Sequence, residues 1–315
     1  MKPHAHPDGE DKPRLRLMPR RLGHVNLFVS DLEQSMAFYE NVAGFHEIFR
    51  EADIQAGFLS NGNTHHDFGL IQTSDVDRVD KNGKVLIAAS QRGRTAGLNH
   101  LGFEMTSERQ LVAVHDEFRR VGLPPGRTVD HGLARSVYLT DPDGNTIEFY
   151  ADTVSDWRSF WRDNLGETVT HGWVPDHAAA SDHPLYPQDG QRDVKEGTPF
   201  QSWRVFAATL NTQDIEAMVA FYEDVVGLRV TAGSVEDGAC TLGTDVEREC
   251  LILNSVPARS SALEMIHVAI DPLQDARRVR ETLARLGIPA SATEPNGALL
   301  LRDPDGFQVR FVRHP

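Results

Sequence analysis

The sequence predicts an α+β fold made of four βαβββ units in two tandem modules. Three observations predict it. The order strand, helix, strands occurs twice before residue 152. The segment 30–45 (SDLEQSMAFYENVAGF) returns at 213–228 as QDIEAMVAFYEDVVGL. The turn DPDG, with its flanking residues, occurs at 141–149 and again at 303–311.

The first unit begins with a strand at 22–29 (LGHVNLFV). Ser30 or Asp31 is expected to cap a helix that ends near Gly44. Short oxygen-bearing side chains satisfy the first free N–H groups of a helix, and glycine ends a helix without strain. Three shorter strands are expected to follow, at 45–50, 55–60 and 66–72.

The second unit is expected to contain a strand at 98–105 and a helix at 108–121, and to end in a β-hairpin. Aspartate first, proline second and glycine fourth suit a type I turn closed by a glycine in the left-handed region. This register places Tyr138 directly opposite Glu148 on one face of the hairpin. The other face is apolar and can join the core, with Val137, Leu139, Ile147 and Phe149.

The repeats divide the chain into a flexible N-terminal arm (1–20), a first module (21–152), a linker rich in Pro, Asp and His (153–202) and a second module (203–315). The spacing between matching segments falls along the chain, so the first copy must hold extra residues. The charged stretch Ser74–Thr95 is the expected insertion, an exposed loop that could cover a pocket. Trp157 and Trp161 are expected to anchor the linker on the first module.

The composition argues against several classes of protein. The 315 residues include 32 Lys and Arg against 46 Asp and Glu, a formal charge of −14, which makes nucleic-acid binding improbable. No apolar run is long enough to cross a membrane, and the N-terminus lacks the apolar segment of a secretory signal. Cys240 and Cys250 lack the spacing of a metal motif, so we expect reduced cysteines in a cytoplasmic protein.

Tandem βαβββ modules with these repeats resemble the vicinal oxygen chelate superfamily, which includes glyoxalase I, bleomycin-resistance proteins and type I extradiol dioxygenases. The resemblance implies that each module is a cupped mixed β-sheet with flanking helices. It also implies a metal inside the cup of the first module, on His24, His100 and Glu148. Two imidazoles and one carboxylate with open positions suit non-haem Fe(II), with Mn(II) as the alternative. Each residue alone would more often be structural; together, at matching strand positions of a repeat, they indicate a metal site.

The stretch 129–148 (VDHGLARSVYLTDPDGNTIE) resembles the ring-cleavage motif of type I extradiol dioxygenases. That resemblance implies that His131 and Tyr138 lie near the metal-bound oxygens of a catechol. It also assigns His66, from the pair His65-His66, as the acid and base acting on substrate and bound oxygen. An ordinary histidine pKa of about 6.5 would suit that role. Without the motif, the pair would be interpreted as polar residues at a solvent-exposed strand start.

The second module provides an internal comparison. The repeat alignment matches His24 with Ala207, His100 with His267 and Glu148 with Arg310. It also matches Tyr138 with Leu300, His131 with Thr293 and His66 roughly with Glu247. A cation at the carboxylate position would repel a metal, so the second module is predicted to be metal-free.

The function predicted on this basis is extradiol ring cleavage: opening of a catechol-type aromatic with O₂ at a mononuclear Fe(II) site, in a homo-oligomer. One alternative is a glyoxalase- or epimerase-like isomerase, or a thiol transferase, with Zn, Ni or Mn. Another is a metal-free protein that binds a small molecule in the cup. In many two-module extradiol enzymes the C-terminal module holds the metal, whereas here the ligand pattern lies in the N-terminal one.

Overall fold

The computed structural model describes residues 17–79, 82–87, 94–120, 127–164, 171–186, 192–258, 262–289, 291–293 and 297–313. Most of the predicted N-terminal arm and parts of the predicted insertion and linker lie outside these residues. No helix in the described ranges is both long enough and apolar enough to cross a bilayer.

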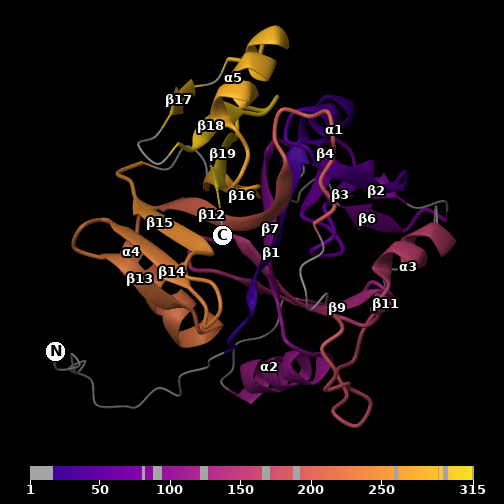
Figure 1. Ribbon diagram of the computed structural model, residues 1–315. Coiled ribbons are helices and arrows are strands. Elements are labelled where there is room, and N and C mark those ends of the chain that lie inside the picture. Colours follow the sequence, from indigo (N-terminus) through magenta and orange to yellow (C-terminus); the bar gives the residue numbers. More distant parts are fainter. Residues whose placement is uncertain are drawn as a thin grey trace.

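The first module forms a nine-stranded mixed sheet in the order β11-β8-β9-β10-β7-β1-β4-β3-β2 (Figure 1). Its strands are β1 (Arg21–Val29), β2 (His46–Glu51), β3 (Ala56–Ser60), β4 (Phe68–Gln72), β7 (Gly97–Glu104), β8 (Arg127–Asp130), β9 (Ala134–Thr140), β10 (Thr146–Asp152) and β11 (His171–Gly172). Its helices are α1 (Leu32–Asn41) and α2 (Glu108–Arg120), while α3 (Trp157–Asp163) and the edge strand β11 lie in the linker, 153–202. Helix α1 packs on β3 and β4, and α2 packs on β9 and β10.

The second module forms an eight-stranded sheet in the order β13-β14-β15-β12-β16-β19-β18-β17. Its strands are β12 (Ser202–Thr212), β13 (Arg229–Ser234), β14 (Ala239–Gly243), β15 (Leu251–Ser255), β16 (Leu263–Ile270), β17 (Ser291–Thr293), β18 (Leu299–Arg302) and β19 (Gln308–Arg313). Its helices are α4 (Ile215–Phe221), which continues into the π-helical turn η1 (Tyr222–Val226), and α5 (Ala276–Arg285). The predicted α+β fold of two tandem modules is therefore confirmed.

Local sequence explains the main elements. The Asp31 side chain caps α1 by accepting a hydrogen bond from the Gln34 N–H at 3.0 Å. In the predicted hairpin, the Asp141 N–H donates to the Asn145 carbonyl and Gly144 has a φ of 80°. Strands β9 and β10 then pair Tyr138 with Glu148, as the turn chemistry predicted. The apolar face of the hairpin is buried in the core.

The predicted insertion 74–95 is not simply a loop. It contains a separate two-stranded sheet, β5 (Arg78–Val79) with β6 (Val85–Ile87), while residues 80–81 and 88–93 lie outside the described part. The tryptophans of the linker pack into the protein as predicted. Trp157 is buried, and the ring of Trp161 stacks on that of Phe49 with 3.9 Å between centroids.

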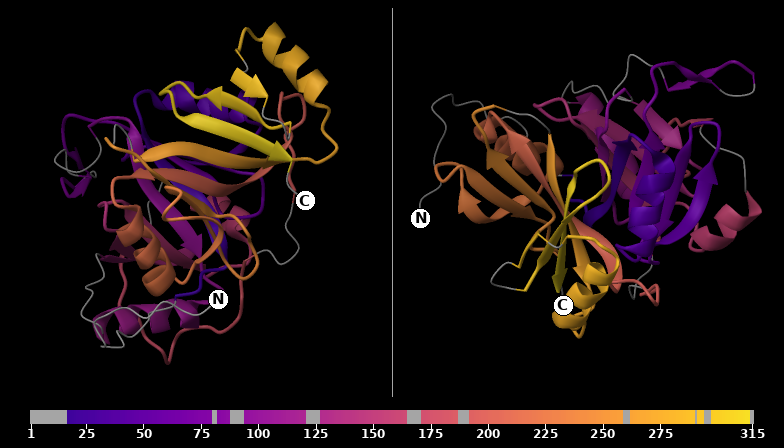
Figure 2. Two further views of the ribbon diagram at one scale, coloured as in Figure 1. Left: turned by 90° about the vertical axis from the view of Figure 1, so that its left-hand side faces the viewer. Right: turned by 90° about the horizontal axis from the view of Figure 1, so that it is seen from above.

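The two modules lie side by side, and strand β1 of the first sheet packs against strand β12 of the second (Figures 1 and 2). Two repeated motifs hold them together reciprocally. The hydroxyl of Tyr39, in α1, donates to Asp303 in the second DPDG turn at 3.0 Å. The hydroxyl of Tyr222, at the matching position of the second module, donates to Asp141 in the first turn at 3.2 Å. The repeats therefore mark an interface with approximate two-fold symmetry.

Strand register corrects the predicted match between the modules. In the first sheet His24 pairs with Gly102, and Gly102 pairs with Glu148. In the second sheet Ala207 pairs with His267, and His267 pairs with Arg310. His267 therefore corresponds to Gly102, not to His100 as the sequence alignment predicted.

The residue of the second sheet that corresponds to His100 is Met265. Asn26 pairs with His100 in the first sheet, and Thr209 pairs with Met265 in the second.

The predicted counterpart of His66 in the second module also needs correction. Parallel pairing of Val25 with Phe68, and of Ala208 with Leu251, makes Glu249 rather than Glu247 the counterpart of His66.

Candidate active site

Three adjacent strands bring the predicted metal ligands together. His24 comes from β1, His100 from β7 and Glu148 from β10, and the three side chains are 0%, 7% and 4% exposed. The Nε2 atom of His24 lies 3.3 Å from Nε2 of His100 and 2.9 Å from Oε2 of Glu148. Nε2 of His100 lies 2.8 Å from the same oxygen. Residues far apart in the sequence therefore present three donor atoms to one point.

The donor set fits a divalent metal ion. Neighbouring ligands of an octahedral ion, each about 2.1 Å from it, are separated by roughly 3 Å, as these three atoms are. Burial lowers the pKa of His24 to about 4, although Glu148 partly opposes this. Burial by itself would raise the pKa of Glu148, but His100 and His24 outweigh it and hold that pKa well below the usual range. Neutral imidazole and ionised carboxylate are the ligand forms that metals bind.

The ring of His24 is enclosed on both faces. It stacks on Tyr150 and on His66, with ring centroids 5.0 and 4.1 Å away. Gly102, on the neighbouring strand, leaves the space for the ring. A Cβ at position 102 would lie 2.0 Å from Nε2 of His24. These contacts fix the imidazole before any metal binds.

Tyr138 and His131 lie next to the candidate ligands. The Tyr138 hydroxyl donates to Oε1 of Glu148 at 2.8 Å, and Nε2 of His131 lies 3.4 Å from that hydroxyl. Burial and the Glu148 carboxylate raise the pKa of Tyr138 well above 10, so it stays protonated at neutral pH. Desolvation lowers the pKa of His131 to about 4, although its side chain is 34% exposed. The guanidinium of Arg127 covers the Tyr138 ring, 4.3 Å from its centroid.

His66 lies in a loop before β4 rather than on the strand that the sequence predicted, and it is 7% exposed rather than at a solvent edge. Its Nε2 lies 3.1 Å from Oδ1 of Asn26, which gives Nε2 the proton and leaves Nδ1 as the acceptor. Burial, with smaller contributions from His24 and His65, lowers the pKa of His66 well below 6.5. The residue is therefore neutral at pH 7, so Nδ1 can accept a proton. Its pKa lies below the ordinary value expected from the sequence, however, which makes it a weaker base than a free histidine.

Its neighbour His65 is held by a carboxylate. Nδ1 of His65 lies 3.0 Å from Oδ1 of Asp152, and both side chains are buried. His65 and His66 form a second group of nitrogen donors with His24, within 4.8 Å of one another. That group shares His24 with the first and has no carboxylate. The group of His24, His100 and Glu148 is therefore the better match for a ferrous ion.

The sequence reasoning missed Asn26, Tyr150 and Asp152. Asn26 follows His24 by two positions on β1, so both side chains face the cup. Tyr150 and Asp152 follow Glu148 at the same interval on β10. Alternation along a strand, applied outward from each candidate ligand, could have found all three.

The cup of the second module carries different chemistry. The three positions that match the candidate ligands hold Ala207, Met265 and Arg310. His267 lies opposite Ala207, at the position of Gly102, so the large side chain of this cross-strand pair comes from the neighbouring strand. Its Nε2 lies 2.8 Å from the Thr209 hydroxyl, and its Nδ1 lies 3.2 Å from Nη1 of Arg310. None of the three candidate ligands has a counterpart there.

Comparison with known proteins agrees with this fold. The chain is 24% identical over 301 residues to a catechol-2,3-dioxygenase of Bacillus subtilis, covering 92% of this chain and 96% of that protein. It is 31% identical over 143 residues to the metallothiol transferase FosB of Lysinibacillus sphaericus, covering 45% of this chain and 89% of that protein.

Solved structures share the architecture. The 2,3-dioxygenase LapB from Pseudomonas sp. KL28 superposes with a TM-score of 0.63 at 14% identity, covering 94% of this chain and 92% of that one. The Mn(II)-bound glyoxalase from Novosphingobium aromaticivorans superposes with a TM-score of 0.61 at 16% identity, covering 93% and 82%. At sequence identities this low, the similarity to these structures shows a shared fold.

The model of the family described as Glyoxalase/Bleomycin resistance protein/Dioxygenase superfamily matches residues 21–149 and again 204–311. These two matches cover both modules and most of the chain. The protein therefore belongs to the glyoxalase, bleomycin-resistance protein and dioxygenase superfamily.

Proposed function

We propose that this protein is an extradiol dioxygenase that opens the ring of a catechol-type substrate with O₂, using Fe(II) or Mn(II) held by His24, His100 and Glu148. The observation that carries the proposal is the convergence of two imidazole nitrogens and one carboxylate oxygen within 3.3 Å of one another, in a buried cup. The similarity over nearly the full chain to a catechol-2,3-dioxygenase supports it.

His24, His100 and Glu148 would hold the metal, which would supply Lewis-acid and redox chemistry for a catechol and O₂. The remaining chemistry belongs to the side chains around it. Nδ1 of neutral His66 is available to take the proton of a substrate hydroxyl, while Asn26 fixes the ring through Nε2. The one O–H of protonated Tyr138, which Glu148 accepts in this structure, could turn to donate to a developing negative charge on the substrate instead. His131 lies beside it as a neutral imidazole.

A second candidate function is a metal-dependent transferase or isomerase without O₂ chemistry. The 31% identity to a metallothiol transferase over 143 residues favours it. Such reactions do not require the trio His66, His131 and Tyr138, which surrounds the candidate metal position here. That trio is why ring cleavage is the first choice.

Reconstitution under argon with Fe(II), followed by a panel of catechols in air, tests the proposal. We expect the absorbance of a yellow ring-opened product, with one O₂ consumed per catechol. The variant Glu148→Ala should lose both bound iron and product formation. If Fe(II)-loaded protein opens no catechol, yet transfers a thiol to an epoxide or isomerises a hemithioacetal, the second candidate function replaces the first.

A further inference from the structure

The segment 61–67 (NGNTHHD), which we call the histidine loop, is buried at every residue although it is a connection between strands. Connections usually run over the surface, because a buried one must satisfy its backbone polar groups within the protein. This loop carries both His65 and His66. Its position therefore sets where the proposed acid–base group of the site lies.

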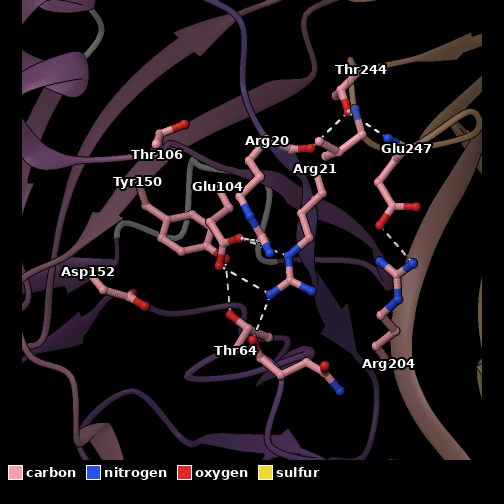
Figure 3. Close-up of polar contacts among 12 residues, drawn as sticks. Arg20, Arg21, Thr64, Glu104, Thr106, Tyr150, Asp152, Arg204, Thr244 and Glu247 are labelled. Atoms are coloured by element: carbon pink, nitrogen blue, oxygen red, sulfur yellow. Dashed lines mark hydrogen bonds and ion pairs between the residues drawn. The ribbon is translucent and has the colours of Figure 1, made fainter. Parts of the chain in front are cut away.

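The first module holds one side of the loop. Nη2 of Arg21 donates to the Asn63 carbonyl at 2.6 Å, and the same guanidinium pairs with Glu104 at 2.8 Å (Figure 3). The Thr64 hydroxyl lies 3.0 Å from that of Tyr150, the residue that stacks on His24 (Figure 3). These contacts come from the same strands as the candidate ligands.

The second module holds the other side. Nδ2 of Asn61 donates to the Ser202 carbonyl at 2.8 Å, and Nδ2 of Asn63 donates to the Trp203 carbonyl at 2.6 Å. Oδ1 of Asp67 accepts from the Val205 N–H at 2.8 Å. All three side chains are at most 2% exposed. The first residues of β12 therefore bind the loop on both sides of His66.

We propose that the second module, which lacks the candidate ligands, positions His66: the start of β12 fixes the histidine loop through Asn61, Asn63 and Asp67. These are positioning residues, since the bonds they form with β12 are to its backbone atoms. The inference rests on the proposed function for the role of His66. It gives the second module a part in the site although its own cup carries no ligand set.

Approximate symmetry provides a matched control. Strand register makes Thr244 the counterpart of Asn61. Its hydroxyl donates across the same interface to the Arg20 carbonyl at 2.8 Å, the distance of the Asn61 contact (Figure 3). Thr244→Val removes this interface hydrogen bond, and the local bonds that the hydroxyl accepts from the Val246 and Glu247 N–H groups, without removing a contact of the histidine loop.

The experiment compares Asn63→Ala and Asp67→Ala with Thr244→Val in the full-length, Fe(II)-loaded protein. We expect the first two to lower kcat about 10- to 100-fold, the cost of displacing a reacting group by about an ångström. Bound iron and the KM for catechol should stay unchanged, and Thr244→Val should keep wild-type kcat. The second test repeats Asn63→Ala in a His66→Phe background, where no further loss of kcat is expected because the lost contact acts through His66.

An unchanged kcat in both loop variants, or an equal loss with and without His66, would overturn the inference. Hydrogen exchange of the amides at 61–67 in metal-free protein provides a readout independent of turnover. It should rise in Asn63→Ala and Asp67→Ala, and not in Thr244→Val. If the wild-type protein opens no catechol, the proposed function fails by itself, and unchanged exchange at 61–67 would then reject the contact with β12 as a positioning device.

Discussion

His24 shows how neighbouring residues prepare a ligand for its metal. Its ring lies between Tyr150 and His66, above a strand position where only glycine fits. Burial keeps its pKa near 4, so protonation does not compete with metal binding at neutral pH. Residues that touch no metal therefore determine whether this imidazole can bind one.

Gly102→Ala should weaken iron binding by about 10- to 100-fold, the usual effect of disturbing the support of a ligand. The added Cβ would lie 2.0 Å from Nε2 of His24 and would push the ring from its place. Titration of the metal-free protein with Fe(II) measures this. Gly172→Ala is the control, because its Cβ would meet no atom within 4 Å. Equal affinity in both variants would show that the ring can move without loss.

His66→Phe should keep stoichiometric iron but lose about 10²–10⁴ in kcat, the usual worth of a placed acid–base group. The phenyl ring can keep the stacking on His24 but cannot accept a proton or bond to Asn26. Metal analysis beside steady-state turnover separates the two effects. Turnover equal to that of the wild type would remove His66 from the mechanism.

Among the elements, the hairpin β9–β10 and the strand β16 differ in how far the local sequence fixes their strand register. The turn DPDG fixes the register of its hairpin locally, so Tyr138 opposite Glu148 follows from turn chemistry. The register of β16 depends on its neighbours in the sheet. A shift of two residues leaves every side chain on the same face, and therefore His267 could be matched with His100 without disturbing the apolar pattern.

The second DPDG turn should add a pH dependence to stability. Burial raises the pKa of Asp303 from 3.8 to about 6, while the Tyr39 hydroxyl and backbone N–H groups partly oppose this. The folded protein therefore binds this proton more tightly than the unfolded chain. The resulting stability is fully present below pH 3.8 and is lost as pH rises through 6.

Asp303→Asn should remove that dependence, since the amide is neutral throughout. The free energy of unfolding of the wild type, relative to the variant, should fall by about 3 kcal/mol between pH 3.5 and 7. Urea unfolding of the metal-free proteins at a series of pH values measures the difference. Parallel profiles would show that Asp303 titrates alike in the folded and unfolded states.

At the scale of the whole molecule, the two repeated modules have cups in which the large and small residues of one cross-strand pair are exchanged. Where the first has His24 facing Gly102, the second has Ala207 facing His267. The two cups therefore exchange a large and a small residue between neighbouring strands. The Tyr39–Asp303 and Tyr222–Asp141 hydrogen bonds keep the modules in one reciprocal contact.

A ligand set can be built into the second cup to test this register. Ala207→His, Met265→His, His267→Gly and Arg310→Glu together should bind one metal ion when Glu148→Ala empties the first site. The pair Ala207→His and Arg310→Glu alone, which follows from the uncorrected alignment, should bind none, because His267 still fills the space. Metal content after dialysis compares the two proteins. Metal in the pair but not in the fourfold variant would contradict the register.

The sequence by itself determined the α+β fold, the tandem repeat and the hairpin that pairs Tyr138 with Glu148. These follow from periodicity, turn chemistry and repeated motifs, which act over a few residues and can be recognised locally. The candidate site residues His24, His100, Glu148, Tyr138, His131 and His66, and their roles, came from the family resemblance.

Only the tertiary structure decided the burial of the histidine loop, the low pKa of His66, its contact with Asn26 and the true counterparts of His100 and His66 in the second module. Each depends on strands and loops that are distant in the chain, and burial changes a pKa through all its surroundings at once. A pattern of neighbouring residues contains no information on such contacts.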